Sequence, residues 1–528
     1  MITGKNYIGS QLVANGTKTY KTINPQLNVE NDWIFTEATP EEIEQAVALA
    51  NQAFKVYKDY SGPEKATFLN AIADEILAIG DPLLDMYCTE SGLPRGRAEG
   101  ERGRTIFQLR SFADMLLEGS WVDATIDTAI EDRQPLPKVD ARKMLVPIGL
   151  IVVFGSSNFP FAYSTAGGDT ASALAAGCPV IVKSHPMHAG TGEMVASAVI
   201  KAAQKTNMPE GVFSNLNSSG IELGVQLVQH PKVKGVGFTG SIKGGRALLD
   251  LAAQRPEPIP IFTEMGSINP VIILPEALER ESDNWASAYA SSITMGTGQF
   301  CTNPGLLLAI KGKELDQFII NLSNEIEKIA PTCMLHPNIK SNYSIGKNTM
   351  QQQHGIKTVA TVAESENPNY ASQTLLSIEG KLFLENSTLH QEVFGPFSII
   401  VQCENESELI AIIDALEGQL SGTIIGGNSE LLRYSAVINS LKNRVGRIVF
   451  NGVPTGVEVC PSTNHGGPYP ASSDSRFTAV GIHAVKRWVR PFGYQNWPND
   501  LLPLELQNEN PLGISRSVNN KQTSLPIL

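Results

Sequence analysis

From Ile148 onward, short apolar runs alternate along the chain with segments of helical periodicity. The runs GLIVVFG, CPVIVKS and KGVGFTG are separated by the helical patterns TAGGDTASALAAG and GTGEMVASAVIKAAQKT. Buried strands that alternate with helices of this size pair in parallel and are joined by right-handed crossovers. A second series of apolar runs, beginning near Asn269, comprises NPVIILP, GLLLAIKG, GPFSIIVQ, SGTIIGG and GRIVFNG. The sequence therefore predicts an α/β protein with two Rossmann-like parallel-sheet domains.

Helices are expected ahead of this series, over residues 40–55, 66–79 and 100–117. The first begins with Thr39 as a suitable N-cap, followed by a proline and two acids in the first turn. The segments 123–142 and 491–528 match neither of the two alternating series, and they are rich in proline, asparagine and charge. They are expected to form an arm and a tail that pack on another surface.

Composition excludes several classes of function. The formal charge is −12 over 528 residues, with a pI near 5.3, which would repel DNA or RNA. The N-terminus lacks the apolar run of a signal peptide, and the most apolar stretch, residues 144–155, is too short to cross a membrane.

The cysteines follow no ligand or disulfide spacing, which fits a reducing cytoplasm; they are Cys88, Cys178, Cys301, Cys333, Cys403 and Cys460. His185 and His188 have an i,i+3 spacing, but Pro186 interrupts the helix that a metal site would need. No metal is expected.

Two segments carry side chains suited to covalent chemistry. Cys301 lies in TMGTGQFCTNPG, where small residues leave a thiol accessible, although a free cysteine is more often buried and inert. Glu264 follows the apolar run PIPIF. Partial desolvation at this position would raise the pKa of its carboxyl and suit a general base, and a solvated acid is the alternative.

Three further candidates follow predicted strands. The turn VGFTGS, ending at Ser241, could hold a pyrophosphate on the N-terminal N–H groups of the next helix, or it could be an ordinary tight turn. Asn158 could donate to an oxyanion or only satisfy its own backbone. Lys183 could pair with a phosphate or a ribose hydroxyl, or simply be solvated.

Taken together, these segments resemble the aldehyde dehydrogenase superfamily along nearly the whole chain. The motifs that carry the resemblance are PIGLIVVFGSSNFPF, VIVKSHP, GFTGS, FTEMGSINP, GQFCTNPG and EVFGP. The resemblance implies a cofactor-binding domain (1–122 and 143–265), a catalytic domain (266–482) and an oligomerisation arm with a tail (123–142 and 483–528). It also implies oxidation of an aldehyde through a cysteine thioester, in a cytoplasmic homodimer or homotetramer.

Matched motif by motif, the resemblance assigns roles to individual residues. Cys301 would be the nucleophile and Glu264 the general base, with Asn158 and the Cys301 backbone N–H as the oxyanion hole. The implied cofactor contacts are Lys183, Ser184, His185, Gly240, Ser241, Glu392 and Phe394.

One departure from the family pattern concerns the cofactor. Members that prefer NAD usually carry a glutamate three residues after the strand-end lysine, to hold the ribose 2′-hydroxyl, and this chain has Pro186 there. A 2′-phosphate would meet no carboxylate at that position, although residues 218–221 (SSGI) offer no arginine to bind it. NADP is therefore the expected cofactor, with NAD as the alternative.

Longer segments resemble the α-ketoglutaric semialdehyde (2,5-dioxopentanoate) dehydrogenase branch, namely LPRGRAEGERGRTIFQLRSFADML, KSHPMHAGT and PTGVEVCPSTNHGGPYPASSDSRFTAVG. Such a substrate carries a carboxylate that a bidentate arginine would bind. Arg102 and Arg110 are roughly 80° apart on a helix and can share one face, whereas Arg104 lies about 200° from Arg102. Arg102 and Arg110 are thus the candidates, and surface or interdomain ion pairs are the alternative.

Four other functions stay open at this point. They are a broad-specificity fatty or short-chain aldehyde dehydrogenase, a dehydrogenase that passes its thioester to CoA, a cofactor-independent thiol hydrolase or acyltransferase, and a silent binding protein that retains the fold.

Overall fold

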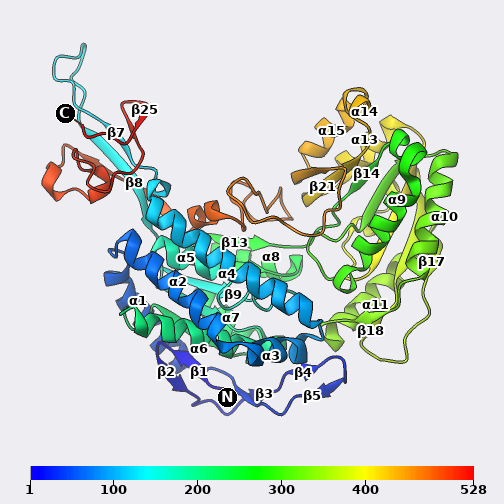
Figure 1. The fold of residues 1–528 in the computed structure, drawn as a ribbon, viewed down its shortest axis with the longest axis horizontal. Coiled ribbons are helices and arrows are strands. Elements are labelled where there is room, and N and C mark those ends of the chain that lie inside the picture. Colours follow the sequence, from blue (N-terminus) through cyan, green and yellow to red (C-terminus); the bar gives the residue numbers. More distant parts are fainter. Residues whose placement is uncertain (1, 528) are drawn as a thin grey trace.

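The first apolar series forms a largely parallel sheet in the computed structural model, which describes residues 2–527 (Figure 1). Its strands, in spatial order, are β13 (Ile261–Glu264), β12 (Val233–Thr239), β9 (Leu150–Phe154), β10 (Val180–Lys183), β11 (Phe213–Leu216), β1 (Asn6–Ile8) and β2 (Gln11–Val13). The first five of these pair in parallel, while β1 and β2 add antiparallel strands from the N-terminal segment. The predicted Rossmann-like arrangement is confirmed here.

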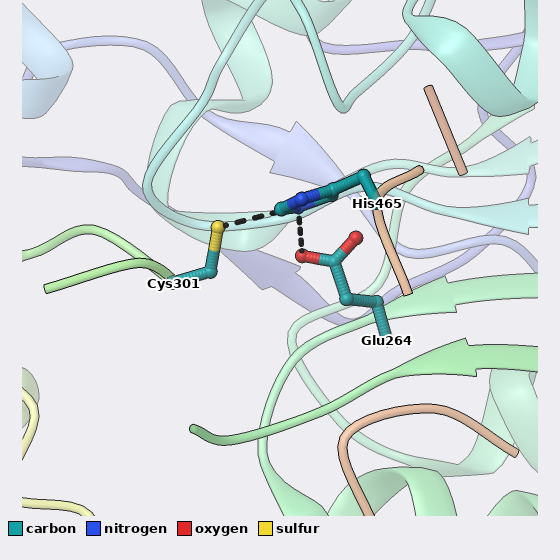
Figure 2. A group of neighbouring side chains, drawn as sticks. All are labelled: Glu264, Cys301 and His465. Carbon is teal, nitrogen blue, oxygen red and sulfur yellow. Dashed lines mark hydrogen bonds and ion pairs between the residues drawn. The ribbon is translucent and has the colours of Figure 1, made fainter. Parts of the chain in front are cut away.

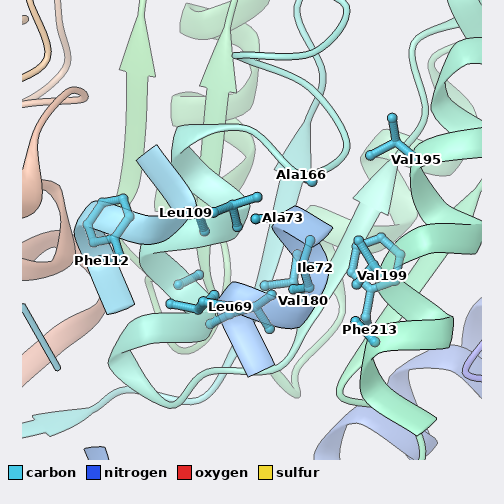
Figure 3. Packing of buried hydrophobic residues seen from close by; sticks show 14 of the residues in the cluster. Leu69, Ile72, Ala73, Leu109, Phe112, Ala166, Val180, Val195, Val199 and Phe213 are labelled. Atoms are coloured by element: carbon cyan, nitrogen blue, oxygen red, sulfur yellow. The ribbon is translucent and has the colours of Figure 1, made fainter. Parts of the chain in front are cut away.

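Helices cover both faces of this sheet. They are α1 (Pro40–Tyr57), α2 (Gly62–Ile79), α3 (Asp81–Ser91), α4 (Arg95–Glu118), α5 (Gly168–Ala176), α6 (Ala189–Lys205), α7 (Glu222–Gln229) and α8 (Ile242–Ala253). Because side chains alternate along a strand, Ile151 and Val153 pack toward α2, α4 and α6, whereas Leu150 and Val152 pack toward α1, α7 and α8. Figure 3 shows Leu69, Ile72 and Leu109 from the first of these helix layers beside Val180 of β10.

The second apolar series forms another sheet with its own cores. Its strands, in spatial order, are β17 (Lys357–Thr361), β19 (Thr374–Glu379), β20 (Phe397–Cys403), β15 (Leu306–Ile310), β14 (Val271–Ile273), β21 (Gln419–Ile425) and β22 (Val445–Phe450). All neighbouring pairs are parallel except β17 with β19. The surrounding helices are α9 (Pro275–Thr294), α10 (Lys313–Glu327), α11 (Pro337–Gln351), α12 (Gly380–Glu385), α13 (Glu406–Ala415), α14 (Asn428–Arg433) and α15 (Ser435–Lys442).

A third, smaller sheet projects away from these two units, at the upper left of Figure 1. Its strands, in spatial order, are β23 (Val489–Gln495), β8 (Ala141–Pro147), β7 (Thr125–Asp127), β24 (Arg516–Val518) and β25 (Lys521–Thr523). It has a small core of its own, which includes Ile126, Met144 and Leu506. Short two-stranded pairs complete the fold: β3 (Thr19–Tyr20) with β6 (Phe35–Thr36), β4 (Ile23–Asn24) with β5 (Val29–Glu30), and β16 (Thr332–Cys333) with β18 (Tyr370–Ala371).

Local sequence signals set the helix boundaries. Thr39 and Glu42 form a reciprocal capping box at the start of α1, and Ser61 and Glu64 do the same for α2. The helix expected to begin at residue 100 instead begins at Arg95, directly after Pro94, because a proline lacks the N–H that an interior helical residue would donate.

Two expected domain edges differ from the observed sheets. The third sheet includes β8 up to Pro147, five residues beyond the expected limit at 142. The segment Ile482–Trp488, expected to belong mostly to the tail, packs Ala484, Val485 and Trp488 into the core of the first unit. These apolar side chains pack on the first unit because burial in its core removes them from water. Within residues 2–527, no helix is long and apolar enough to cross a membrane.

Candidate active site

The ends of three parallel strands, β9, β12 and β13, lead to the lining of one cavity of about 340 Å³, and β10 ends nearby. β9 leads into the loop of Asn158, β10 ends at Lys183, β12 leads to Ser241 and β13 ends at Glu264. Carboxyl ends of parallel strands lie at a common edge of the sheet, where ligands bind in open α/β folds. The sequence-predicted residues that line the cavity are Asn158, Gly240, Ser241, Glu264, Cys301, Glu392 and Phe394.

Cys301 reaches this cavity from the second unit, on the loop that precedes β15. Gly298 in this loop has φ of +65°, and a Cβ there would lie 2.1 Å from the Gly395 carbonyl oxygen, so only glycine fits. The Asn269 amide donates to the carbonyl oxygens of Cys301 and Asn303, both at 2.9 Å. The position of the thiol is therefore fixed by backbone contacts on both sides.

Cys301, Glu264 and His465 form one compact group (Figure 2). The His465 Nε2 atom lies 2.9 Å from Glu264 Oε1 and 3.6 Å from Cys301 Sγ. Sequence reasoning missed His465, although the histidine lies in the quoted segment STNHGGPYP. No local pattern links it to a cysteine 164 positions away.

The electrostatics of this group differ from the sequence-based expectation. Burial alone would raise the pKa of Glu264, but the charge and hydrogen bond of His465, with a smaller contribution from Cys301 and Arg487, hold the pKa below its ordinary value. The expected raised pKa of this carboxyl is therefore wrong. Burial, and then the nearby Glu264 charge, raise the pKa of the Cys301 thiol well above its ordinary range. The resting site thus combines an ionised carboxylate with a neutral thiol.

Asn158 lies on a loop that is hydrogen-bonded to Glu101 of helix α4. Its Nδ2 donates to the Gln299 carbonyl oxygen at 3.0 Å, and an amide carries a second hydrogen that can donate to a ligand. The Glu101 carboxylate, which is buried, accepts from the backbone N–H groups of Phe161 and Ala162 at 2.8 and 3.0 Å. A buried carboxylate with these donors orders the loop that carries Asn158.

The other predicted cofactor residues lie around the end of β10. Lys183 Nζ donates to the Ser218 carbonyl oxygen at 2.8 Å, and burial lowers the pKa of this lysine to about 8. The buried Ser184 hydroxyl has no partner among the described residues. His185 stacks on His188 with ring centroids 5.0 Å apart, and burial lowers the pKa of His185 well below its ordinary value. Lys183, Ser184 and His185 do not line the 340 Å³ cavity itself.

The residues at this edge fit a dinucleotide. Ser241 caps α8, a helix of 12 residues, by accepting from Gly244 N at 3.2 Å, so the helix N-terminus opens toward the cavity. The unpartnered Ser184 hydroxyl and the Lys183 ammonium add hydrogen-bond donors nearby. Donors of this kind suit the phosphates and ribose hydroxyls of a nicotinamide dinucleotide.

Glu264, Cys301 and His465 offer three types of ligand that a zinc ion accepts, with ligand atoms within 4.8 Å of one another. The imidazole nitrogen that such an ion would need already bonds Glu264 and faces the thiol. The placement of His465 Nε2 between the carboxylate and the thiol fits activation of a nucleophilic thiol better than a zinc site.

The arginines expected to bind substrate point elsewhere, which corrects that interpretation. Arg102 contacts the Gly80 carbonyl oxygen at 3.5 Å, and Arg110 pairs with Asp74 at 3.1 Å on the exposed face of α4. Arg104, on the other face, donates to the Tyr163 hydroxyl at 3.1 Å. Arg102 and Arg110 do share a face, but that face points away from the site, and Arg110 forms the surface ion pair that was the alternative interpretation.

Replacing the carboxylate should make the thiol more acidic. In Glu264→Gln the negative charge that raises the Cys301 pKa is gone, so we expect alkylation of Cys301 by iodoacetamide at pH 7 to be at least threefold faster, with its pH midpoint moved down. Mass spectrometry of the alkylated peptide from pH 6 to 10 measures both. Exposed Glu279→Gln is the matched control, and an unchanged midpoint in Glu264→Gln would contradict the coupling.

The chain is similar to known proteins along nearly its whole length. Residues 12–476 match the model of the aldehyde dehydrogenase family. The chain is 44% identical over 516 residues to alpha-ketoglutaric semialdehyde dehydrogenase 2 of Azospirillum brasilense, covering 98% of each. It is 42% identical over 521 residues to alpha-ketoglutaric semialdehyde dehydrogenase of Acinetobacter baylyi, covering 98% of this chain and 99% of the relative.

Solved structures share the fold at low sequence identity. Betaine aldehyde dehydrogenase of Staphylococcus aureus in complex with NAD⁺ superposes with a TM-score of 0.81 at 19% identity, covering 94% of this chain and 96% of the other. Methylmalonate-semialdehyde dehydrogenase of Oceanimonas doudoroffii gives 0.80 at 19% identity, covering 94% and 99%. With a family match over most of the chain and two relatives that align along nearly its whole length, the chain belongs to the aldehyde dehydrogenase family.

Proposed function

We propose that this aldehyde dehydrogenase oxidises 2,5-dioxopentanoate, the semialdehyde of α-ketoglutarate, to 2-oxoglutarate. The observation that carries the chemistry is the contact of Cys301 with the His465–Glu264 pair beside the cavity at the strand ends. The substrate comes from the names of the two relatives that match along nearly the full length. The aldehyde dehydrogenase family uses NAD(P) as the hydride acceptor.

The first step is activation of the thiol. One ring nitrogen, Nε2 of His465, faces both Cys301 Sγ and Glu264 Oε1. Its N–H can donate to the Cys301 thiolate as the thiol proton leaves through the cavity to solvent, so the Glu264 carboxylate stays ionised for the later hydrolysis. The thiolate is thus generated at the moment of attack, although burial keeps the resting thiol neutral.

The thiolate then attacks the aldehyde carbon and forms a tetrahedral adduct. Its oxyanion accepts hydrogen bonds from the free Nδ2–H of Asn158 and the backbone N–H of Cys301. A bound nicotinamide dinucleotide supplies the hydride acceptor. The Cys301 thioester remains, and Glu264 removes a proton from the water that attacks it, which releases the carboxylate and restores the thiol.

The alternatives fit these contacts less well. A thiol hydrolase or a silent scaffold would have no use for the donor-lined strand ends beside the thiol. A buried ionised carboxylate close to Cys301 favours water over CoA as the acceptor of the acyl group, because it can serve as the base that water needs.

Removal of the base should separate the two halves of the reaction. With 2,5-dioxopentanoate, Glu264→Gln is expected to release about one equivalent of reduced cofactor per site in a burst, followed by turnover that is about 10²–10⁴-fold slower than wild type. Stopped-flow absorbance at 340 nm, roughly the maximum of reduced nicotinamide, records both phases. Cys301→Ala is the control and should give neither phase.

Two results would contradict the proposal. A normal steady-state rate in Glu264→Gln would mean that another group activates water. A wild-type enzyme with a lower kcat/KM for 2,5-dioxopentanoate than for uncharged pentanal would refute the substrate.

For the cofactor, we propose that Lys183, Ser184, Ser241 and Glu392 contact the dinucleotide and that Glu37 limits the preference for NADP. Ser219 donates to the Glu37 carboxylate through its backbone N–H, at 3.2 Å, and through its hydroxyl. The charge of Glu37 also acts on Lys183. A carboxylate thus lies beside the segment 218–221 although none stands at Pro186, and it would repel a 2′-phosphate.

Two substitutions should therefore move the preference in opposite directions. We expect Glu37→Gln to raise the ratio of kcat/KM for NADP to that for NAD by about fivefold, since about 1 kcal/mol of charge repulsion is removed. Pro186→Glu should lower the same ratio, because it adds a carboxylate near the ribose. Steady-state kinetics with each cofactor measure the ratio, and exposed Glu41→Gln is the control. If this ratio is unchanged in both variants, neither Glu37 nor position 186 lies near the 2′ group of the cofactor ribose, and the proposal is wrong.

We further propose that the sheet of β7, β8, β23, β24 and β25 joins copies of this chain into a homodimer or homotetramer. Strand β23 has a free edge and, with the segment after it, exposes Phe492, Trp497 and Leu501. Sedimentation equilibrium should give a mass of two or four times 56.9 kDa, and a monomer at micromolar concentration would contradict this role.

A further inference from the structure

Two arginines from different units lie close to the reacting thiol without an acidic partner. Arg104 belongs to α4 and Arg447 to β22. Within residues 2–527, neither forms an ion pair with a carboxylate, and the Nε atom of each is buried without a hydrogen-bond partner. Other arginines of α4 do have acidic partners, such as Arg95 and Arg110.

Arg104 faces the active site through Tyr163. Its Nη2 donates to the Tyr163 hydroxyl at 3.1 Å, and its guanidinium carbon lies 5.5 Å from the centre of that ring. The Tyr163 ring is in turn 6.3 Å from the ring of His465, which contacts Cys301. Burial raises the pKa of Tyr163, so the phenol keeps its proton and can donate to an anion.

Arg447 approaches the same place from the second sheet. Its Nη2 donates to the Pro454 carbonyl oxygen at 3.1 Å. Burial lowers the pKa of this guanidinium, and the positive charge of Arg104 adds to that effect, while Cys301 and Tyr163 oppose it. The charges of Arg104 and Cys301 thus both act on the Arg447 guanidinium.

An apolar wall adjoins these charges. Phe159, Tyr163, Phe300 and Val459 form one cluster with Ala162 and Val480, and Phe300 directly precedes Cys301. Arg97 covers this wall from outside, with its guanidinium carbon 4.4 Å from the Phe159 ring and 4.5 Å from the Phe300 ring. Arg97 already approaches Glu101 at 3.4 Å, so it does not need an anion from a ligand.

We propose that Arg104 and Arg447 bind the carboxylate of the substrate, while the wall of Phe159, Phe300 and Val459 contacts its methylene carbons and directs the aldehyde to Cys301. Two half-buried cations whose Nε atoms are buried without partners are costly, and a ligand carboxylate would satisfy both. The site selects short aldehydes that end in a carboxylate or 2-oxo carboxylate. This inference rests on the proposed function and identifies how that substrate is recognised.

Substitution of each arginine by leucine tests the site. For Arg104→Leu and Arg447→Leu we expect the KM for 2,5-dioxopentanoate to rise at least tenfold more than the KM for pentanal, an uncharged aldehyde of equal length. Arg104→Lys should recover part of the loss, because it keeps the charge without the bidentate geometry. Arg110→Leu, on the opposite face of the same helix, is the matched control and should leave the ratio unchanged.

A binding measurement separates this proposal from the proposed function. Isothermal titration of wild type with 2-oxoglutarate, the non-reacting product, should show binding that weakens at least tenfold in each leucine variant and not in Arg110→Leu. If wild type binds 2-oxoglutarate through these arginines but prefers another acidic aldehyde, the arginine site stands and the substrate is wrong.

The arginine proposal itself is overturned by either of two results. One is an equal loss for 2,5-dioxopentanoate and pentanal in both leucine variants, which would show a structural role. The other is an enzyme that prefers 2,5-dioxopentanoate while the variants keep wild-type KM and 2-oxoglutarate affinity.

Discussion

A short pairing between distant parts of the chain holds the active site together. Met265 N donates to the Ala471 carbonyl oxygen at 2.9 Å, and Ser473 N donates to the Thr263 carbonyl oxygen at 3.1 Å, so Glu264 pairs with Ser472. The segment after the second sheet thereby returns to the end of β13. This return brings the segment of His465 to the Glu264 carboxylate.

The chemistry of the site depends on a balance between burial and charge. Burial opposes ionisation of both Glu264 and Cys301, but the nearby groups lower the pKa of the carboxyl, whereas the Glu264 charge raises the pKa of the thiol further. Separation of a charged base from a neutral nucleophile protects the thiol from reagents in solution and leaves the proton path short. The same low dielectric strengthens the interaction of the site with a developing oxyanion.

The unpaired arginines extend this principle to recognition. Arg104 and Arg447 lower the stability of the free protein, since each buries polar atoms without partners. Such a cost is typical of functional sites, where the ligand completes the contacts that the fold leaves open. In the proposed recognition, the apolar cluster that includes Phe300, the residue before Cys301, would give the ligand a defined length and orientation.

Local pattern alone determined the two parallel sheets, the capped helices and the strand-end positions of Asn158, Lys183, Ser241 and Glu264, because strand and helix periodicities are set by neighbouring residues. Only the tertiary structure decided that His465 meets Cys301, that Glu37 lies beside the segment 218–221, and that Arg104 faces inward while Arg102 and Arg110 do not. These contacts join residues far apart in sequence, and burial and partner charges at them determine ionisation, so no local pattern records them.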